Sequence, residues 1–233
     1  MIKTLAFDAD DTLWHNHPVF SLTQKQFCDL LVPYMDSIEG LGKRLEDMEI
    51  RNLKRFGYGI KGFTLSMIET AVEATEGRIS SADIRTLLDY GKAMLDHPVE
   101  LLDGVRETLE RIAGDYPLMI ITKGDLFDQE GKIARSGLAD MFPRIEIVSE
   151  KDMATYQKIM QRHSVDGPGF MMVGNSVRSD ILPVLKAGGR AVHIPYITDW
   201  VHERVDNPEM EFPVLSSIRD LPDWLRAGFP GKG

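Results

Sequence analysis

The sequence predicts an α/β protein, with a Rossmann-like parallel sheet covered by helices on both faces and an inserted all-helical domain. Three observations lead to this prediction. After residue 97, short apolar runs alternate with amphipathic segments, which is the pattern of a buried parallel sheet. A further apolar run stands alone at residues 2–7, directly before an acidic cluster. Between them, residues 16–96 show helical periodicity and no strand pattern.

The five apolar runs are the predicted strands, and the amphipathic segments between them are the predicted helices. The tail from Thr198 onward contains proline and charge with little periodicity, and we predict irregular structure there. The strands are expected at 2–7, 117–122, 144–149, 169–174 and 190–195, and the helices at 104–112, 127–138, 152–163 and 179–187.

The stretch at residues 16–96 contains four amphipathic segments. Ser80, three residues before Asp83, resembles a capping box that opens the fourth. Because the strand at 2–7 must pair with strands beyond residue 116, this stretch is expected to be an insertion. We therefore predict a sheet domain at 1–15 and 97–233 and a helical domain at 16–96. The apolar positions that define the first three segments are Phe20, Phe27, Leu30, Leu31, Tyr34, Leu41, Leu45, Met48, Met67, Ile68, Ala71 and Val72.

Composition narrows the class of protein. The 233 residues correspond to between one and two domains at roughly 150 residues each. A net charge of −9 opposes binding to a nucleic acid backbone, and no apolar run approaches the ~18 residues of a membrane span. Cys28 is the only cysteine, and the acidic turn at Asp8 is unlike a signal peptide, so we expect a cytoplasmic protein. Its oligomeric state is left open.

An acidic cluster follows the first predicted strand, at the edge where open parallel sheets place their sites. Asp8 and Asp10 are two residues apart, so an extended chain would direct both to one face. Two carboxylates that close require a cation or a shared proton, and an oxygen-only cluster suits Mg²⁺. The alternative interpretation is a helix cap within a solvated acidic turn.

Three other predicted strands are followed by groups suited to a phosphate bound near a metal. Thr122 ends the second strand and Lys123 follows it, and a hydroxyl with free backbone N–H groups can hold a phosphate oxygen. Lys151 follows the third strand, and Lys158 in the next predicted helix competes with it for that role. Asn175 and Asp180 follow the fourth strand. Each signal alone is also typical of an ordinary turn; their combination is not.

These residues resemble the motifs of the haloacid dehalogenase superfamily, whose members are mostly phosphohydrolases. The segment DADDT at 8–12 matches the DxDxT signature, and Thr122, Lys151 and the segment GNSVRSD at 174–180 match the later motifs in order. The resemblance covers residues 1–15 and about 97–197. The helical insertion is similar only in architecture to the family's C1-type cap.

The resemblance implies a role for each matching residue. Asp8 would be the nucleophile that forms an aspartyl-phosphate, and Asp10 the general acid and base, with its backbone carbonyl on Mg²⁺. Thr122 and Lys151 would bind the transferring phosphoryl group. The metal residues would be Asp8, Asp10, Asn175 and Asp180, the last as a supporting residue. The family usually has aspartate where this chain has Asn175, so weaker metal binding or an altered metal preference is expected.

The expected function is a Mg²⁺-dependent phosphohydrolase that acts on a small phosphorylated metabolite, a phosphomonoester. A phosphomutase, or an enzyme that hydrolyses a C–P bond with Lys54 or Lys61 as Schiff-base lysine, remains an alternative. So does a binding or regulatory protein with little activity. Asp10 argues against the dehalogenase branch of the family, which does not need that acid.

The segment Gly57–Gly62 matches the G-x-G-x-x-G pattern of dinucleotide sites. That fingerprint must follow a strand, whereas here it follows a charged helical segment inside the insertion. We therefore interpret it as a turn between helices. If it faces the substrate, Tyr58 and Lys61 would be the contact residues.

Overall fold

The computed structural model describes residues 1–197, 200–203, 205, 208 and 210–229. Its sheet has five parallel strands in the order β3-β2-β1-β4-β5, which confirms the predicted α/β class. All five predicted strands form, within one or two residues of their expected limits. They are β1 (Thr4–Phe7), β2 (Leu118–Lys123), β3 (Arg144–Val148), β4 (Phe170–Gly174) and β5 (Arg190–His193).

The first strand of the chain lies in the middle of the sheet. Phe7, the last residue of β1, is in register with Ile120 of β2 and Val173 of β4. Because all strands are parallel, the segments that follow β1, β2 and β4 emerge side by side at one edge of the sheet. This topology brings together residues that are more than 100 positions apart in the sequence.

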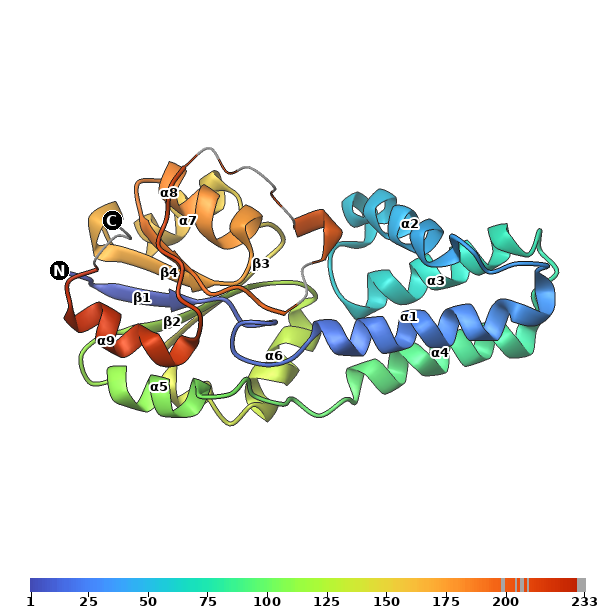
Figure 1. The fold of residues 1–233 in the computed structure, drawn as a ribbon, viewed down its shortest axis with the longest axis horizontal. Helices are drawn as coiled ribbons and strands as arrows, with labels where there is room; N and C mark the ends of the chain where they lie inside the picture. Colours follow the sequence, from blue (N-terminus) through green and yellow to red (C-terminus); the bar gives the residue numbers. More distant parts are fainter. Residues whose placement is uncertain (198–199, 204, 206–207, 209, 230–233) are drawn as a thin grey trace. The chain divides into compact units, whose positions relative to one another are not determined.

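Each face of the sheet is covered by helices, as Figure 1 shows. Alternate strand residues face opposite sides: Leu5 and Phe7 belong to one apolar cluster, and Ala6 belongs to the other. Helices α5 (Val105–Ile112), α6 (Leu126–Arg135) and α9 (Leu221–Arg226) contribute to the first cluster. Helices α7 (Met153–Arg162) and α8 (Leu182–Lys186) contribute to the second.

The helical unit has an apolar core of its own. Its helices are α1 (His17–Leu31), α2 (Leu41–Phe56), α3 (Ile60–Ala74) and α4 (Ser81–Leu95). The predicted cap of α4 is confirmed, because the Ser80 side chain accepts a hydrogen bond from the backbone N–H of Asp83. No helix in the described part of the chain has the length and apolar composition that a bilayer span demands. Buried residues of this core include Phe27, Leu31, Leu41, Leu45, Phe63, Met67 and Leu87.

The chain forms two compact units. One comprises Met1–His15, Val99–Lys123 and Gln129–Gly233; the other comprises Asn16–Pro98 with Gly124–Asp128. The sequence-based division had placed residues 97–98 and 124–128 in the sheet domain. Residues 124–128, which follow β2, therefore belong to the helical unit. Sequence periodicity cannot predict this, because it describes a single helix or strand and not the unit with which a short loop packs.

One local expectation was wrong. The tail was expected to be irregular, and its residues 198–199, 204, 206–207, 209 and 230–233 lie outside the described part of the chain. Among the described tail residues, α9 forms, and its Leu221 and Leu225 are buried in the sheet core. A six-residue helix is too short to show a clear apolar period. The helix expected at 179–187 does form, as a π-helical turn at Val177–Ile181 followed by α8, and Pro183 lies in the first turn of α8 as expected.

Candidate active site

A buried ammonium group lies between two carboxylates at the end of β1. Lys151 Nζ donates to Asp180 Oδ1 at 2.7 Å and also to Asp8 Oδ1. The side chains of Lys151 and Asp180 are 2% and 1% exposed. When both carboxylates are ionised, one positive charge faces two negative charges away from water, and the net charge of the three groups is −1. Lys158 is exposed, and it is Lys151 that reaches Asp8.

This environment changes the ionisation of both Asp8 and Lys151. Burial and the nearby Asp180 charge raise the pKa of Asp8 to about 7, although Lys151 acts in the opposite direction. Burial alone would lower the pKa of Lys151, but the two carboxylates outweigh it and raise that pKa. Lys151 therefore stays charged, while Asp8 needs further positive charge to remain fully ionised at neutral pH.

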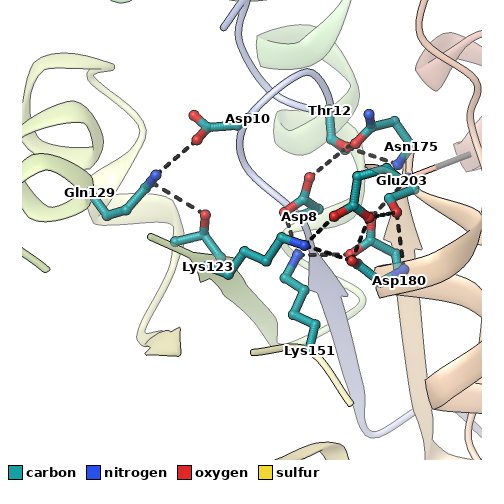
Figure 2. A network of polar contacts seen from close by, with 12 residues as sticks. Asp8, Asp10, Thr12, Lys123, Gln129, Lys151, Asn175, Asp180 and Glu203 are labelled. Atoms are coloured by element: carbon teal, nitrogen blue, oxygen red, sulfur yellow. Dashed lines mark hydrogen bonds and ion pairs between the residues drawn. The ribbon is translucent and has the colours of Figure 1, made fainter. Parts of the chain in front are cut away.

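Thr12 joins the loop after β1 to the loop after β4. Its hydroxyl lies 3.2 Å from Asp8 Oδ2 and 3.0 Å from Asn175 Oδ1, as Figure 2 shows. The same hydroxyl accepts a hydrogen bond from the Asn175 backbone N–H at 3.1 Å. The final threonine of DADDT thus holds the Asp8 carboxylate and the Asn175 amide oxygen close together.

Asp180 is enclosed by the loop that follows β4. Its Oδ2 accepts a hydrogen bond from the Ser176 backbone N–H at 3.0 Å, while Oδ1 receives Lys151. A Cβ atom at Gly174 would lie 2.3 Å from Asp180 Oδ2, so only glycine fits there. Both oxygens of Asp180 thus have protein partners, and the residue links Lys151 to the loop after β4.

The Asp10 side chain points away from Asp8 and toward α6 (Figure 2). Lys132 Nζ lies 2.8 and 2.9 Å from its two oxygens, and Gln129 Nε2 and Trp14 Nε1 donate to it at 2.8 and 2.7 Å. Burial alone would raise the pKa of Asp10, but Lys132, Gln129 and Trp14 together lower it. Its carboxylate is therefore the favoured form.

Sequence reasoning missed Gln129 and Lys132. Both lie on α6, one helical turn apart, and both are less than a tenth exposed. The only sequence signal was that Gln129 and Lys132 are three residues apart, which places them on one face of the helix that follows Thr122. Polar residues at this spacing are also common on surface helices. Only the packing of α6 against the loop after β1 gives these two residues a site role.

Thr122 and Lys123 lie at the end of β2, but not as expected. The strand continues to Lys123, so Thr122 is its penultimate residue. The Thr122 hydroxyl is buried and lies 3.3 Å from Gln129 Oε1, so Gln129 links Thr122 to Asp10. Lys123 Nζ donates to Ser179 Oγ at 2.9 Å and forms an ion pair with Glu203.

Glu203 is a second residue that the sequence did not single out. It lies in the tail, where irregular structure had been predicted. Its carboxylate contacts Lys123 and accepts hydrogen bonds from Ser176 and from Ser179, the latter at 2.6 Å. Burial would raise the pKa of Glu203, but Lys123 and the two hydroxyls lower it to about 2.

Tyr58 and Lys61 belong to the helical unit. Residues 57–59 form the expected turn between α2 and α3, with φ of 72° at Gly57 and 109° at Gly59, whereas residues 60–62 are already the first turn of α3. Lys61 Nζ lies 2.9 Å from Asp125 Oδ1, and its side chain is 53% exposed. Asp125 belongs to the same unit, so this ion pair lies within the helical unit.

The predicted metal residues provide oxygen donors of the type Mg²⁺ prefers. Thr12 keeps the Asp8 carboxylate and the Asn175 amide oxygen together, and Asp10 can offer only its backbone carbonyl because its side chain turns to α6. Among the described residues, no three His, Cys, Asp or Glu side chains are grouped to hold an ion. A metal here would thus depend on the amide and backbone oxygens as well as on Asp8.

Comparisons with known proteins agree with the geometry. A haloacid dehalogenase-like hydrolase from Xanthomonas campestris has a solved structure that is 44% identical, with a TM-score of 0.86, covering 97% of this chain and 91% of that one. A 2-haloacid dehalogenase from Pseudomonas syringae is 25% identical, with a TM-score of 0.65, covering 98% and 100% of the two chains.

Among curated proteins, the pyrimidine 5'-nucleotidase YjjG of Escherichia coli is 27% identical over 94% of this chain and 96% of its own. The family model for haloacid dehalogenase-like hydrolases matches residues 2–188. That match spans strands β1 to β4, the buried Asp8–Lys151–Asp180 cluster and the helical insertion, and it ends before β5. The chain is therefore a hydrolase that belongs to the haloacid dehalogenase-like family.

Proposed function

We propose that this hydrolase is a Mg²⁺-dependent phosphatase that acts on a small phosphomonoester through Asp8. The observation that carries the proposal is the buried Lys151 ammonium, held against Asp8 at the end of the central strand. A fixed positive charge beside a nucleophilic carboxylate is suited to stabilising a phosphoryl group during transfer. Thr122, at the end of the neighbouring strand β2, adds a hydroxyl for one phosphoryl oxygen.

Asp8 attacks phosphorus through one carboxylate oxygen, the bond to the ester oxygen breaks, and an aspartyl-phosphate forms. Water then attacks that phosphorus, which releases phosphate and restores Asp8. Asp8 would hold Mg²⁺ together with Asn175 and the Asp10 carbonyl. When bound, Mg²⁺ would supply the positive charge that keeps Asp8 ionised and balances the phosphate.

Asp10 is the proposed general acid and base. The leaving alkoxide gains a proton from it, and the attacking water later loses one to it. Lys132, Gln129 and Trp14 favour its carboxylate, which is the form that accepts a proton from water. For the first step Asp10 must carry a proton and reach the ester oxygen, so its hold on Lys132 has to loosen during turnover.

The helical unit is proposed to act as a cap that selects the substrate. Its independent apolar core supports this role, because a unit with its own core can vary without disturbing the sheet. Tyr58 and Lys61 remain the proposed substrate contacts. Lys54 and Lys61 are both exposed, whereas desolvation is what activates a lysine for Schiff-base chemistry, which disfavours C–P bond hydrolysis.

The substrate panel follows from the relatives. One relative is named as a pyrimidine 5'-nucleotidase, so nucleoside 5'-monophosphates should be tested first, beside sugar phosphates and p-nitrophenyl phosphate. Another is named as a 2-haloacid dehalogenase, so halide release from 2-chloropropionate is the competing assay. We expect phosphate release that requires Mg²⁺, and no halide release.

The decisive variant is Asp8→Asn, which preserves shape but removes the nucleophile. Its phosphatase kcat is expected to fall more than about 10³-fold. Asp166→Asn is the matched control, because Asp166 makes a surface ion pair with Lys3 and is 59% exposed. Halide release by the wild type, or retention of more than a few per cent of phosphatase activity by freshly purified Asp8→Asn, would refute the assignment. Return of the phosphoryl group to the substrate would indicate a mutase.

A further inference from the structure

The carboxylate of Glu203 lies among donors that come from two different parts of the sheet edge. Lys123 is the last residue of β2, while Ser176 and Ser179 belong to the loop and the π-helical turn after β4. These strands flank β1, which ends just before Asp8. Glu203 itself is 14% exposed and Lys123 is 15% exposed, so water has little access to the pair.

The hydrogen bonds give each of these groups a defined direction. The hydroxyls of Ser176 and Ser179 both donate to Glu203 Oε2, and Lys123 contacts Oε1. Lys123 also donates to the Ser179 hydroxyl at 2.9 Å, and the Ser179 backbone N–H donates to the Ser176 hydroxyl at 3.0 Å. Each hydroxyl thus accepts one hydrogen bond from a neighbouring donor and directs its own proton to the anion. Figure 2 labels Lys123 and Glu203 of this network.

We propose that Lys123, Ser176 and Ser179 form an anion-binding subsite in which Glu203 is an internal ligand. Its external ligand is a second anionic group of the phosphoester substrate, either a carboxylate or another phosphate. The identity of that ligand rests on the proposed function, whereas the anion subsite itself does not. Glu203 is then a specificity-determining residue, because a substrate must offer an anion to replace it.

The exchange of one anion for another is chemically balanced. Without Glu203, the largely buried Lys123 ammonium would keep only the half-exposed Glu150 carboxylate at 3.9 Å, and the two oriented hydroxyls would lose their acceptor. That loss carries a desolvation cost, so a neutral substrate group is a poor replacement for the carboxylate. An incoming carboxylate or phosphate restores the same charge and accepts the same hydrogen bonds. Glu203 therefore competes with anions for Lys123, and its removal should tighten anion binding.

The test is isothermal titration calorimetry of the full chain with inorganic phosphate and, separately, with malonate. Glu203→Ala is expected to bind at least one of these anions at least tenfold more tightly than the wild type. The gain should disappear in the double variant Glu203→Ala, Lys123→Met. Glu110→Ala is the control, because Glu110 is an exposed residue of α5 and its loss changes the net charge equally. A gain for malonate alone identifies a carboxylate subsite, and a gain for phosphate alone identifies a phosphate subsite.

Glu203→Gln provides a second route if the alanine variant does not fold. It keeps the shape of the side chain without the charge, and a smaller gain in anion affinity is expected. Unchanged affinity for both anions in folded Glu203 variants, or a gain that persists without Lys123, would show that Glu203 only anchors the tail. Because calorimetry needs no turnover, failure of the phosphatase assay leaves this test intact, and the two proposals can fail separately.

Discussion

The sheet-bearing unit and the helical unit differ in where their ion pairs lie. In the first, Lys151 and Asp180 are almost completely buried. In the second, the pairs Lys25–Asp29 and Lys43–Asp47 lie on helix surfaces, with every side chain at least 56% exposed. Buried charges cost several kcal/mol each unless they are well paired. The comparison therefore supports the proposal that the reaction takes place in the sheet-bearing unit.

The two units also differ in how their buried polar groups are satisfied. Asn52 in the helical unit donates to Ser66 and Glu69, which is hydrogen bonding between helices around an apolar core. Around Asp8, each polar group instead contacts residues from loops after different strands. A single substitution there should therefore affect several loops at once, whereas one on a helix surface should remain local. The following predictions test that difference.

The largest contrast should come from removing one lysine in each unit. Lys151→Met leaves Asp8 and Asp180 facing each other without a counter-charge, and is expected to lower the free energy of unfolding by about 3–5 kcal/mol. Lys43→Met removes an exposed helix pair and should cost less than about 1 kcal/mol. Urea denaturation of both variants measures the two values. If both variants lost a similar free energy of unfolding, burial of the Asp8–Lys151–Asp180 cluster would not make its ion pairs more important for stability than a surface pair.

A second prediction concerns the ion pair between Lys132 of α6 and Asp10. Lys132→Met is expected to lower kcat by about tenfold to 100-fold, a typical range for disturbing a general acid–base. Losing a positive neighbour raises the pKa of Asp10, so the acidic limb of the kcat profile should move to higher pH. Lys186→Met, an exposed residue of α8, is the matched control. An unchanged pH dependence of kcat would show that Lys132 does not set the pKa of the general acid–base.

The stability that Glu203 contributes should depend on pH, because its carboxylate is ion-paired with Lys123. Its pKa is about 2 in the folded protein against an ordinary value of 4.5, so its stabilising effect is present above pH 4.5 and is lost as the pH falls toward 2. At pH 6 we expect Glu203→Gln to be less stable than the wild type by about 1–3 kcal/mol. Urea denaturation at pH 6 and pH 3 should show this difference shrinking in acid; a constant difference would contradict the ion pair with Lys123.

The smallest expected effect is that of Asn175→Asp. The new carboxylate adds negative charge beside Asp8, to which Thr12 links residue 175. Opposite charges at contact distance attract strongly in a poorly solvated site, so the Mg²⁺ concentration for half-maximal rate should fall several-fold. Thermal unfolding with and without Mg²⁺ gives an activity-independent measure. An unchanged or higher Mg²⁺ requirement would exclude residue 175 as a ligand.

Much of the fold was predictable because its signals are local. Apolar runs such as 117–122 and 169–174 mark buried parallel strands wherever they occur. The segment DADDT and the order of the later motifs indicated the family before any contact was known. The tail was misjudged because α9 is short, and its Leu221 and Leu225 reveal their role only when they reach the sheet core.

The sequence by itself determined the class of fold, the family and the candidates Asp8, Thr122, Lys151 and Asp180. Only the tertiary structure decided which groups share charge: Lys151 rather than Lys158 reaches Asp8, Lys132 holds Asp10, and Glu203 engages Lys123. The physical reason is distance along the chain. The pattern of apolar and polar residues around a position indicates which face of a helix or strand its side chain occupies. It does not indicate the electrostatic partner, because that depends on which strand ends and helices meet in space. The partners in these three pairs are separated by 80 to 143 residues.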